Sequence, residues 1–183
     1  MSDIVLVLEA IVFLISAVII FRVIVRRDYL NKGKLSWYAS SLEFIIFALH
    51  ANSAYLFLPS SWPELPALPP FTWQIIFGVS IAVIGFLALL STMIYLGISK
   101  AFGLKADGLR TTGSYRFTRN PQLIFYLLVL IGIAIIWLSW YAIIWVFLYL
   151  VIAHVMVLTE EEHLGKVYGE DYRRYCQHVP RYL

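Results

Sequence analysis

Long runs of apolar residues, separated by short polar segments, dominate this chain. Five runs predict spanning helices, because about 18 or more apolar residues are needed to cross a bilayer as a helix. These runs are Ile4–Val25, Trp37–Leu58, Trp73–Ile98, Gln122–Leu138 and Trp140–Leu158. The pattern therefore predicts an all-α polytopic membrane protein with five transmembrane helices. Tryptophans at the ends of the runs suit the membrane interface.

Charge predicts the orientation of these helices. All 14 lysines and arginines fall at or just after the end of the first run, between the third and fourth runs, or after the fifth. Because cytoplasmic loops are rich in basic residues, we expect the N-terminus outside and the C-terminus in the cytoplasm. The net charge of +3 then indicates contact with anionic membrane lipids and not with nucleic acid.

The chain is interpreted as one integrated membrane domain in two parts. Residues 1–98 hold the first three spans, and residues 99–183 hold a loop, a helical hairpin and a short C-terminal amphipathic helix. The first run lacks the basic start and the cleavage site of a signal peptide, so we expect it to be retained. The absence of a targeting signal favours a prokaryotic inner membrane, and the single Cys176 fits a reducing compartment.

The polar segment before the fourth run has the composition of a ligand-binding loop. It contains Gly103, Gly108 and Gly113, which allow a close approach of the backbone to a ligand. Asn120 and Pro121 then begin the fourth helix, where proline sacrifices no hydrogen bond. The exposed N–H groups of that helix end would suit a carboxylate or another anion.

The fourth and fifth runs form a tight hairpin joined by little more than Ser139. Their far ends must therefore lie close together at the same edge of the membrane. Glu160, Glu161 and Glu162 project around the fifth helix, so at most two can face the hairpin, and Glu162 is interpreted as part of a solvated turn. Glu160 or Glu161 near Arg119 would be paired and charged. The sequence thus predicts a charged pocket at this edge.

Ionisable residues inside apolar runs are candidates for function. His154 lies in the fifth run near the carboxylates and is a candidate catalytic residue. Glu43 and His50 are seven apart and share a helix face, which suits either a structural contact between helices or a role with the substrate. The four histidines lack the spacing of metal ligands.

Two motifs flank the hairpin. The first reads Gly113-Ser114-Tyr115 and Arg119-Asn120-Pro121, and the second reads Glu160-Glu161, Tyr168-Gly169, Tyr172, Tyr175 and Val179-Pro180-Arg181. In this order and spacing the chain from about Lys100 to Arg181 resembles the isoprenylcysteine carboxyl methyltransferase family. Its ending is also similar to that of phospholipid N-methyltransferases. The resemblance implies an enzyme that binds S-adenosyl-L-methionine (SAM) and methylates a lipophilic or prenylated acceptor from the bilayer.

The resemblance also implies the residues of the site. Its cofactor contacts would be Asp107, Gly108, Leu109, Arg110, Tyr115, Asn120, Pro121, Gln122, Leu123 and Glu160, with Arg119 as a further cation for the cofactor carboxylate. Glu161 is the partner carboxylate and, with His154, a candidate catalytic residue. Met156 stands where the family has an arginine that meets the substrate, so it is a candidate substrate contact together with His50.

Other functions remain open at this point. The chain could methylate the nitrogen or sulfur of a phospholipid or another small molecule. A related hairpin occurs in NADPH-dependent membrane reductases of the sterol type. A non-catalytic membrane scaffold is the third alternative.

Overall fold

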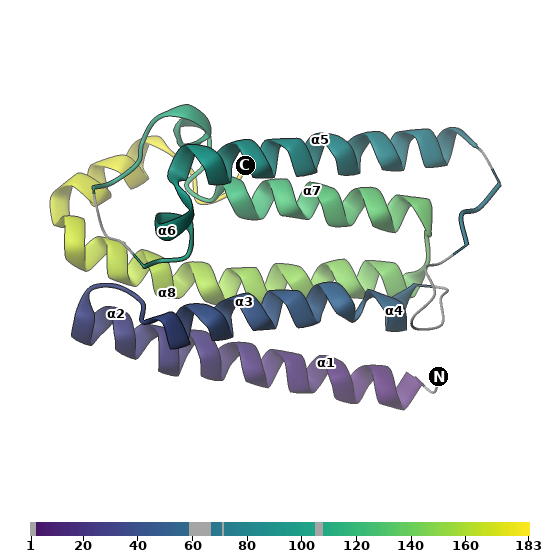
Figure 1. Ribbon diagram of the computed structural model, residues 1–183, viewed down its shortest axis with the longest axis horizontal. Coiled ribbons are helices and arrows are strands. Elements are labelled where there is room, and N and C mark those ends of the chain that lie inside the picture. Colours follow the sequence, from purple (N-terminus) through teal and green to yellow (C-terminus); the bar gives the residue numbers. More distant parts are fainter. Residues whose placement is uncertain (1–2, 59–66, 71, 105–107) are drawn as a thin grey trace.

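The computed structural model describes residues 3–58, 67–70, 72–104 and 108–183, and this part of the chain is helical without any strand. Its elements are α1 (Asp3–Val18), the π-helix η1 (Ile19–Val25), α2 (Arg26–Lys32), α3 (Trp37–Asn52), α4 (Ala54–Phe57), α5 (Trp73–Leu96), α6 (Ile98–Ala101), the 3-10 turn η2 (Gly113–Arg116), α7 (Pro121–Ile136) and α8 (Trp140–His178). The long helices run along one axis, with α7 between α5 and α8 and with α3 and α1 on the other side of α8 (Figure 1). The predicted all-α class is confirmed.

The prediction of five spanning helices is wrong. Among the described residues, three helices are long and apolar enough to cross a membrane, and they contain 27, 24 and 39 residues (Leu6–Lys32, Trp73–Leu96 and Trp140–His178). The predicted second span is divided into α3 and α4. The predicted fourth span is α7, which has 16 residues. At 1.5 Å per residue it extends about 24 Å, less than the roughly 30 Å of a hydrocarbon core.

Polar contacts explain the break between α3 and α4. The Ser53 hydroxyl donates a hydrogen bond of 2.7 Å to the carbonyl of His50, and the Trp145 indole donates to the same carbonyl at 2.9 Å. Two side chains therefore occupy the acceptor that would continue the helix. Because Trp145 belongs to α8, this break depends on a contact between distant parts of the chain.

The turn between α7 and α8 is as short as the sequence predicts. Trp137 leaves the helical conformation at φ −114° and ψ 58°, and Ser139 caps α8 by accepting from the N–H of Ala142 at 3.1 Å. Asn120 precedes Pro121 at the first position of α7. The hairpin thus returns the chain to the level at which α7 begins.

Glycines allow α5 and α7 to pack with their backbones in close contact. A Cβ atom at Gly132 would lie 2.5 Å from the carbonyl oxygen of Gly78, and one at Gly85 would lie 2.8 Å from that of Phe125. Small residues at helix contacts are typical of membrane proteins, where close packing takes the place of the hydrophobic effect. This contact fixes α7 in the bundle.

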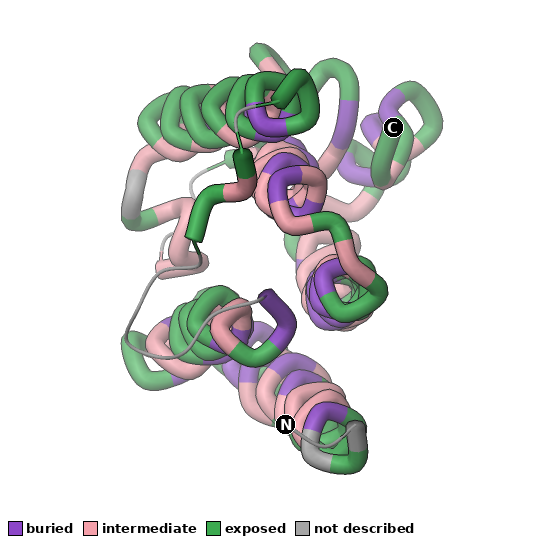
Figure 2. The backbone as a smooth tube through the Cα atoms, turned by 90° about the vertical axis from the view of Figure 1, so that its right-hand side faces the viewer, coloured by how far each residue is buried: buried purple, intermediate pink, exposed green. Residues whose placement is uncertain are grey.

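Buried residues lie mainly between the helices, and exposed ones lie mainly on the outward faces (Figure 2). Many large apolar side chains on those faces are exposed, including Phe77, Ile94 and Phe147. Trp37, Trp73 and Trp140 are exposed at the first residues of α3, α5 and α8. This distribution suits a surface in contact with lipid and interfacial tryptophans. The orientation in the membrane stays a prediction.

The predicted C-terminal helix is not a separate element but the continuation of α8. The two parts meet at Gly169, whose φ of 51° and ψ of −117° are not helical. Only glycine adopts such a conformation at little cost, so this residue permits the chain to fold back (Figure 1). The aromatic residues of the second motif pack as a cluster in which Tyr172, Tyr175 and Val179 are buried against Leu109.

Candidate functional site

A cavity opens at the end of the bundle where α7 begins. It is open on one side and contains about 1010 Å³ of empty space, part of which lies in the open mouth. Every described member of the predicted cofactor set lines it, namely Gly108, Leu109, Arg110, Tyr115, Arg119, Asn120, Pro121, Gln122, Leu123 and Glu160. Asp107 lies outside the described residues. The structure brings these side chains together, and their role with a cofactor stays a prediction.

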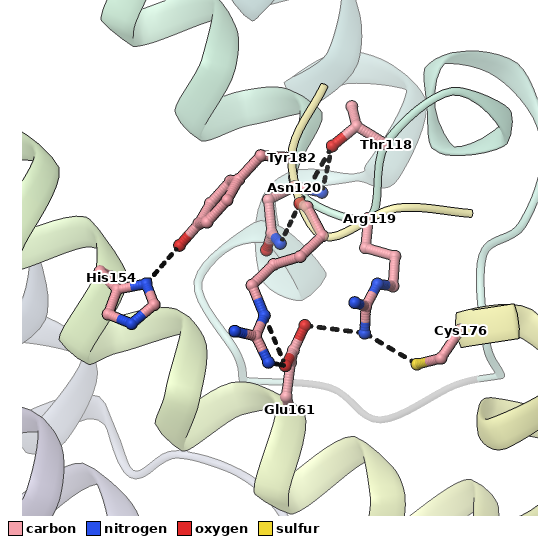
Figure 3. A network of polar contacts seen from close by, with 8 residues as sticks. Thr118, Arg119, Asn120, His154, Glu161, Cys176 and Tyr182 are labelled. Atoms are coloured by element: carbon pink, nitrogen blue, oxygen red, sulfur yellow. Dashed lines mark hydrogen bonds and ion pairs between the residues drawn. The ribbon is translucent and has the colours of Figure 1, made fainter.

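Two arginines bind one carboxylate at the wall of this cavity. Arg119 Nη1 lies 2.8 Å from Glu161 Oε1, and Arg181 Nη2 lies 2.6 Å from Glu161 Oε2 (Figure 3). The pairing of a carboxylate with Arg119 predicted from the hairpin is thereby confirmed. The hydrogen bonds to Glu161 raise the pKa of the Arg181 guanidinium, so this guanidinium stays charged. Glu161 is occupied by cations of the chain itself.

The residues before α7 also hold the C-terminal tail, which we define as residues 179–183. The N–H of Arg119 donates to the carbonyl of Pro180 at 3.0 Å. The Asn120 amide and the Thr118 hydroxyl both donate to the carbonyl of Arg181, at 2.9 and 3.2 Å (Figure 3). One of the two side-chain N–H groups of Asn120 is therefore engaged by the tail.

Glu160 differs from its two neighbours because, among the described residues, no hydrogen bond or ion pair engages it. It lines the cavity together with Tyr115. Burial, reinforced by the negative charge of Glu160, raises the pKa of the Tyr115 hydroxyl. The hydroxyl therefore stays protonated and available for hydrogen bonding at ordinary pH. A carboxylate beside a neutral phenol is suited to hold a cation.

Hydrogen-bond donors on another wall of the cavity lack partners. Within the described part of the chain, no side chain caps the first turn of α7, and Gln122 Nε2 and Arg119 Nε are buried without a hydrogen bond. Unpaired buried donors cost free energy unless a ligand or water engages them. The cavity therefore has the uncapped first turn of α7 on one wall and the carboxyl group of Glu160 on another.

Glu162 points away from the cavity. Both of its oxygens accept hydrogen bonds of 2.8 Å from the guanidinium of Arg26, and Lys166 contacts it at 3.1 Å. The expectation that at most two of the three carboxylates face the hairpin is confirmed. Glu162 is a structural contact that joins α2 to α8 and is not simply a solvated turn.

The other predicted site residues are divided among three places. Met156 lines the cavity. His154 lies outside it, in a second, apolar cavity, where its Nδ1 lies 2.9 Å from the hydroxyl of Tyr182. His50 lines neither cavity, because it is buried between helices, stacked on Trp145 and hydrogen bonded to that residue's carbonyl at 3.0 Å. The structure therefore shows a packing role for His50, and its contact with a substrate stays a prediction.

Sequence reasoning missed several cavity residues from outside the hairpin. The ring of Tyr29 in α2 stacks on His163 with centroids 4.0 Å apart, and both side chains line the cavity. Arg181 was recognised as part of a motif but not as the partner of Glu161. A possible signal was the position of Tyr29 in the basic segment after the first run, at the same membrane edge as the motifs.

A sequence model of the phospholipid methyltransferase family matches residues 73–171, which is more than half of the chain. The matched segment contains α5, α7, the first part of α8 and most of the residues of the cavity. No curated protein and no solved structure matches the chain. The family and the apolar helices agree on a membrane methyltransferase. The chain belongs to the phospholipid methyltransferase family.

Proposed function

We propose that this protein binds SAM in the cavity at the start of α7 and transfers its methyl group to a lipophilic acceptor from the bilayer. The observation that carries the proposal is the set of unpartnered groups in one cavity. Glu160 lacks a partner in the described structure, and the buried Gln122 and Arg119 nitrogens do as well. These groups have the charges and donors that such a ligand would need.

The residues fit the chemistry of SAM. Its carboxylate suits the uncapped first turn of α7 and the Arg119 Nε donor, because a helix N-terminus binds anions. Its amine and sulfonium suit Glu160 and the aromatic rings of Tyr115 and Tyr29, because carboxylates and aromatic faces attract cations. When bound, SAM supplies an electrophilic methyl group on a sulfonium.

The chain's own contribution would be alignment and exclusion of water. A displacement at a methyl group needs the two reactants held in line in a dry site. Glu161 would keep the turn before α7 and the tail in place through its two arginines. We propose that the acceptor is of the isoprenylcysteine or phospholipid type and that the site faces the cytoplasm of a prokaryotic cell. A carboxylate or thiolate acceptor would need little base assistance, and for an amine His154 is the candidate base.

Titration of the purified protein with SAM in detergent tests the proposal. We expect saturable heat of binding, and NADPH should not compete, which separates this function from that of a reductase. Glu160→Gln should weaken SAM binding roughly 10-fold to 100-fold, the value of a hydrogen bond to a charged group. Tyr115→Phe should weaken it less, since it removes only a neutral hydroxyl.

Glu170→Gln is the matched control. Glu170 lies on the same helix, is exposed and, within the described part of the chain, pairs with Arg173, so SAM affinity should not change. No heat and no thermal shift at millimolar SAM would overturn the proposal. Equal affinity of the Glu160→Gln variant and the wild type would remove Glu160 from the site.

A further inference from the structure

A second cavity lies in the apolar part of the hairpin, and we call it the α7–α8 groove. It lies between residues 123–127 of α7 and residues 149–155 of α8, with Tyr182 and Leu183 beside it. It contains about 1120 Å³ of empty space, open on one side. Apart from His154 and the two tyrosine hydroxyls, the side chains that line it are hydrocarbon.

The position of the α7–α8 groove restricts what can occupy it. Leu150 at its rim is 42% exposed and belongs to the apolar part of a helix long enough to span the membrane. Within a bilayer such a surface is in contact with lipid and not with water, because water finds no polar partners there. A hydrocarbon chain is therefore the occupant that matches both the lining and the surroundings.

The α7–α8 groove and the polar cavity meet at Leu123, which lines both. The tail lies at this junction. On the cavity side, Arg181 is held by Glu161 at 2.6 Å. On the groove side, the hydroxyl of the next residue, Tyr182, lies 2.9 Å from His154 Nδ1 (Figure 3). The His154–Tyr182 pair is thus a polar group at the end of the α7–α8 groove, beside the proposed SAM site.

We propose that the α7–α8 groove holds the hydrocarbon chain of the methyl acceptor and that the His154–Tyr182 pair holds the acceptor's polar end. This assignment rests on the proposed function, because only that function makes the bound ligand a methyl acceptor. An imidazole and a phenol can each donate or accept a hydrogen bond, so the pair can exchange its mutual bond for one to the ligand. A molecule bound in this way has its chain in the bilayer and its head at the junction with the cavity.

Photolabelling tests the site of the chain. The probe is a stearoyl lysophospholipid with a diazirine in the middle of its chain, added to the full-length protein in detergent. We expect label in peptides from α7 and from residues 140–160 of α8. Leu150→Trp should fill the groove and reduce this label to background. Leu87→Trp is the matched control, because Leu87 is an exposed leucine of α5 outside both cavities, and it should label as the wild type does.

A competition experiment tests the polar end. Octadecanol should displace the probe better than octadecene, because only the alcohol can bond to the pair. Tyr182→Phe keeps the ring but removes the hydroxyl, so it should weaken competition by octadecanol about threefold to tenfold, the effect of one neutral hydrogen bond, and leave octadecene unchanged. Equal competition by both compounds in the wild type would overturn the role of the pair.

Equal labelling of the two tryptophan variants would overturn the α7–α8 groove as the chain site, and so would label confined to α5. SAM titration of the same samples separates this result from failure of the proposed function. Intact SAM binding with no groove-specific label contradicts only the groove. Groove-specific label with no SAM binding would overturn the ligand's identity as a methyl acceptor together with the proposed function.

Discussion

Glu161 joins three parts of the chain that are far apart in sequence, and a double-substitution cycle on its arginines measures what this junction contributes. Arg119 comes from the turn before α7, Arg181 from the tail and Glu161 from α8. The perturbations are Arg119→Gln, Arg181→Gln and the two together. Each removes a positive charge and keeps a polar side chain of moderate size.

The expected magnitudes follow from burial. The Arg119 and Glu161 side chains are 14% and 13% exposed, whereas that of Arg181 is 37% exposed. Loss of Arg119 should lower the free energy of unfolding by about 1–2 kcal/mol, because Arg181 still neutralises the carboxylate. Loss of Arg181 alone should cost less than about 1 kcal/mol, since solvent screens it. Loss of both leaves a mostly buried carboxylate without a cation and should cost about 3–5 kcal/mol.

The assay is reversible unfolding in mixed micelles with increasing sodium dodecyl sulfate, followed by tryptophan fluorescence. The loss of unfolding free energy in the double variant should exceed the sum of the two single losses by about 1 kcal/mol or more, as for residues that share a partner. Arg174→Gln is the control, because Arg174 pairs with Asp171 on an exposed helix face, and it should change stability by less than about 0.5 kcal/mol. Additive effects, or losses no larger than this control, would refute the shared role of Glu161.

Three further substitutions test the fold. Gly132→Ala should lower the unfolding free energy by about 1–3 kcal/mol, because an added Cβ would lie 2.5 Å from a backbone oxygen of α5. Gly165→Ala is its control: the nearest atom to an added Cβ lies at 3.9 Å, so this change should be neutral or slightly stabilising in the same assay. Gly169→Ala should lower the unfolding free energy by at least about 1 kcal/mol, since alanine is strained at a φ of 51°. Faster proteolysis of the tail would report this loss of stability. His50→Leu removes the hydrogen bond to the Trp145 carbonyl, so it should lower the unfolding free energy by about 0.5–1.5 kcal/mol and leave SAM affinity unchanged; weaker SAM binding would contradict its packing role.

Much of the site could be predicted from sequence because it depends on local features. Pro121 begins α7, Ser139 caps the start of α8, and a turn this short places Arg119 and Glu161 at the same edge of the bundle. The motifs lie next to these boundaries. Hydrophobic patterning therefore predicts the hairpin, and the hairpin places the motif residues around one cavity.

The errors concern contacts between distant segments. Hydropathy contains no information about the hydrogen bonds from Ser53 and Trp145 to the His50 carbonyl. The sequence therefore predicts one span where the structure has α3 and α4. Hydropathy also does not register that Gly169 turns α8 back on itself. The tail then brings Arg181 to Glu161 and Tyr182 to His154. No spacing within either motif indicates such a contact.

The contribution of the N-terminal helices was also not predictable. Tyr29 reaches the cavity because α2 packs against α8. Its ring stacks there on that of His163. This segment lies outside residues 73–171, which match the family. Part of the cavity wall is therefore supplied by a region for which no motif was available.

Ultraviolet cross-linking of radiolabelled SAM to the purified protein, followed by peptide mapping, tests the central claim most directly. The account predicts label in residues 108–123, in residues 156–175 or in the peptide that contains Tyr29, and loss of that label in the Glu160→Gln variant. Label confined to α3, or label of the same intensity in that variant, would contradict the placement of the cofactor between the start of α7 and the carboxylates of α8.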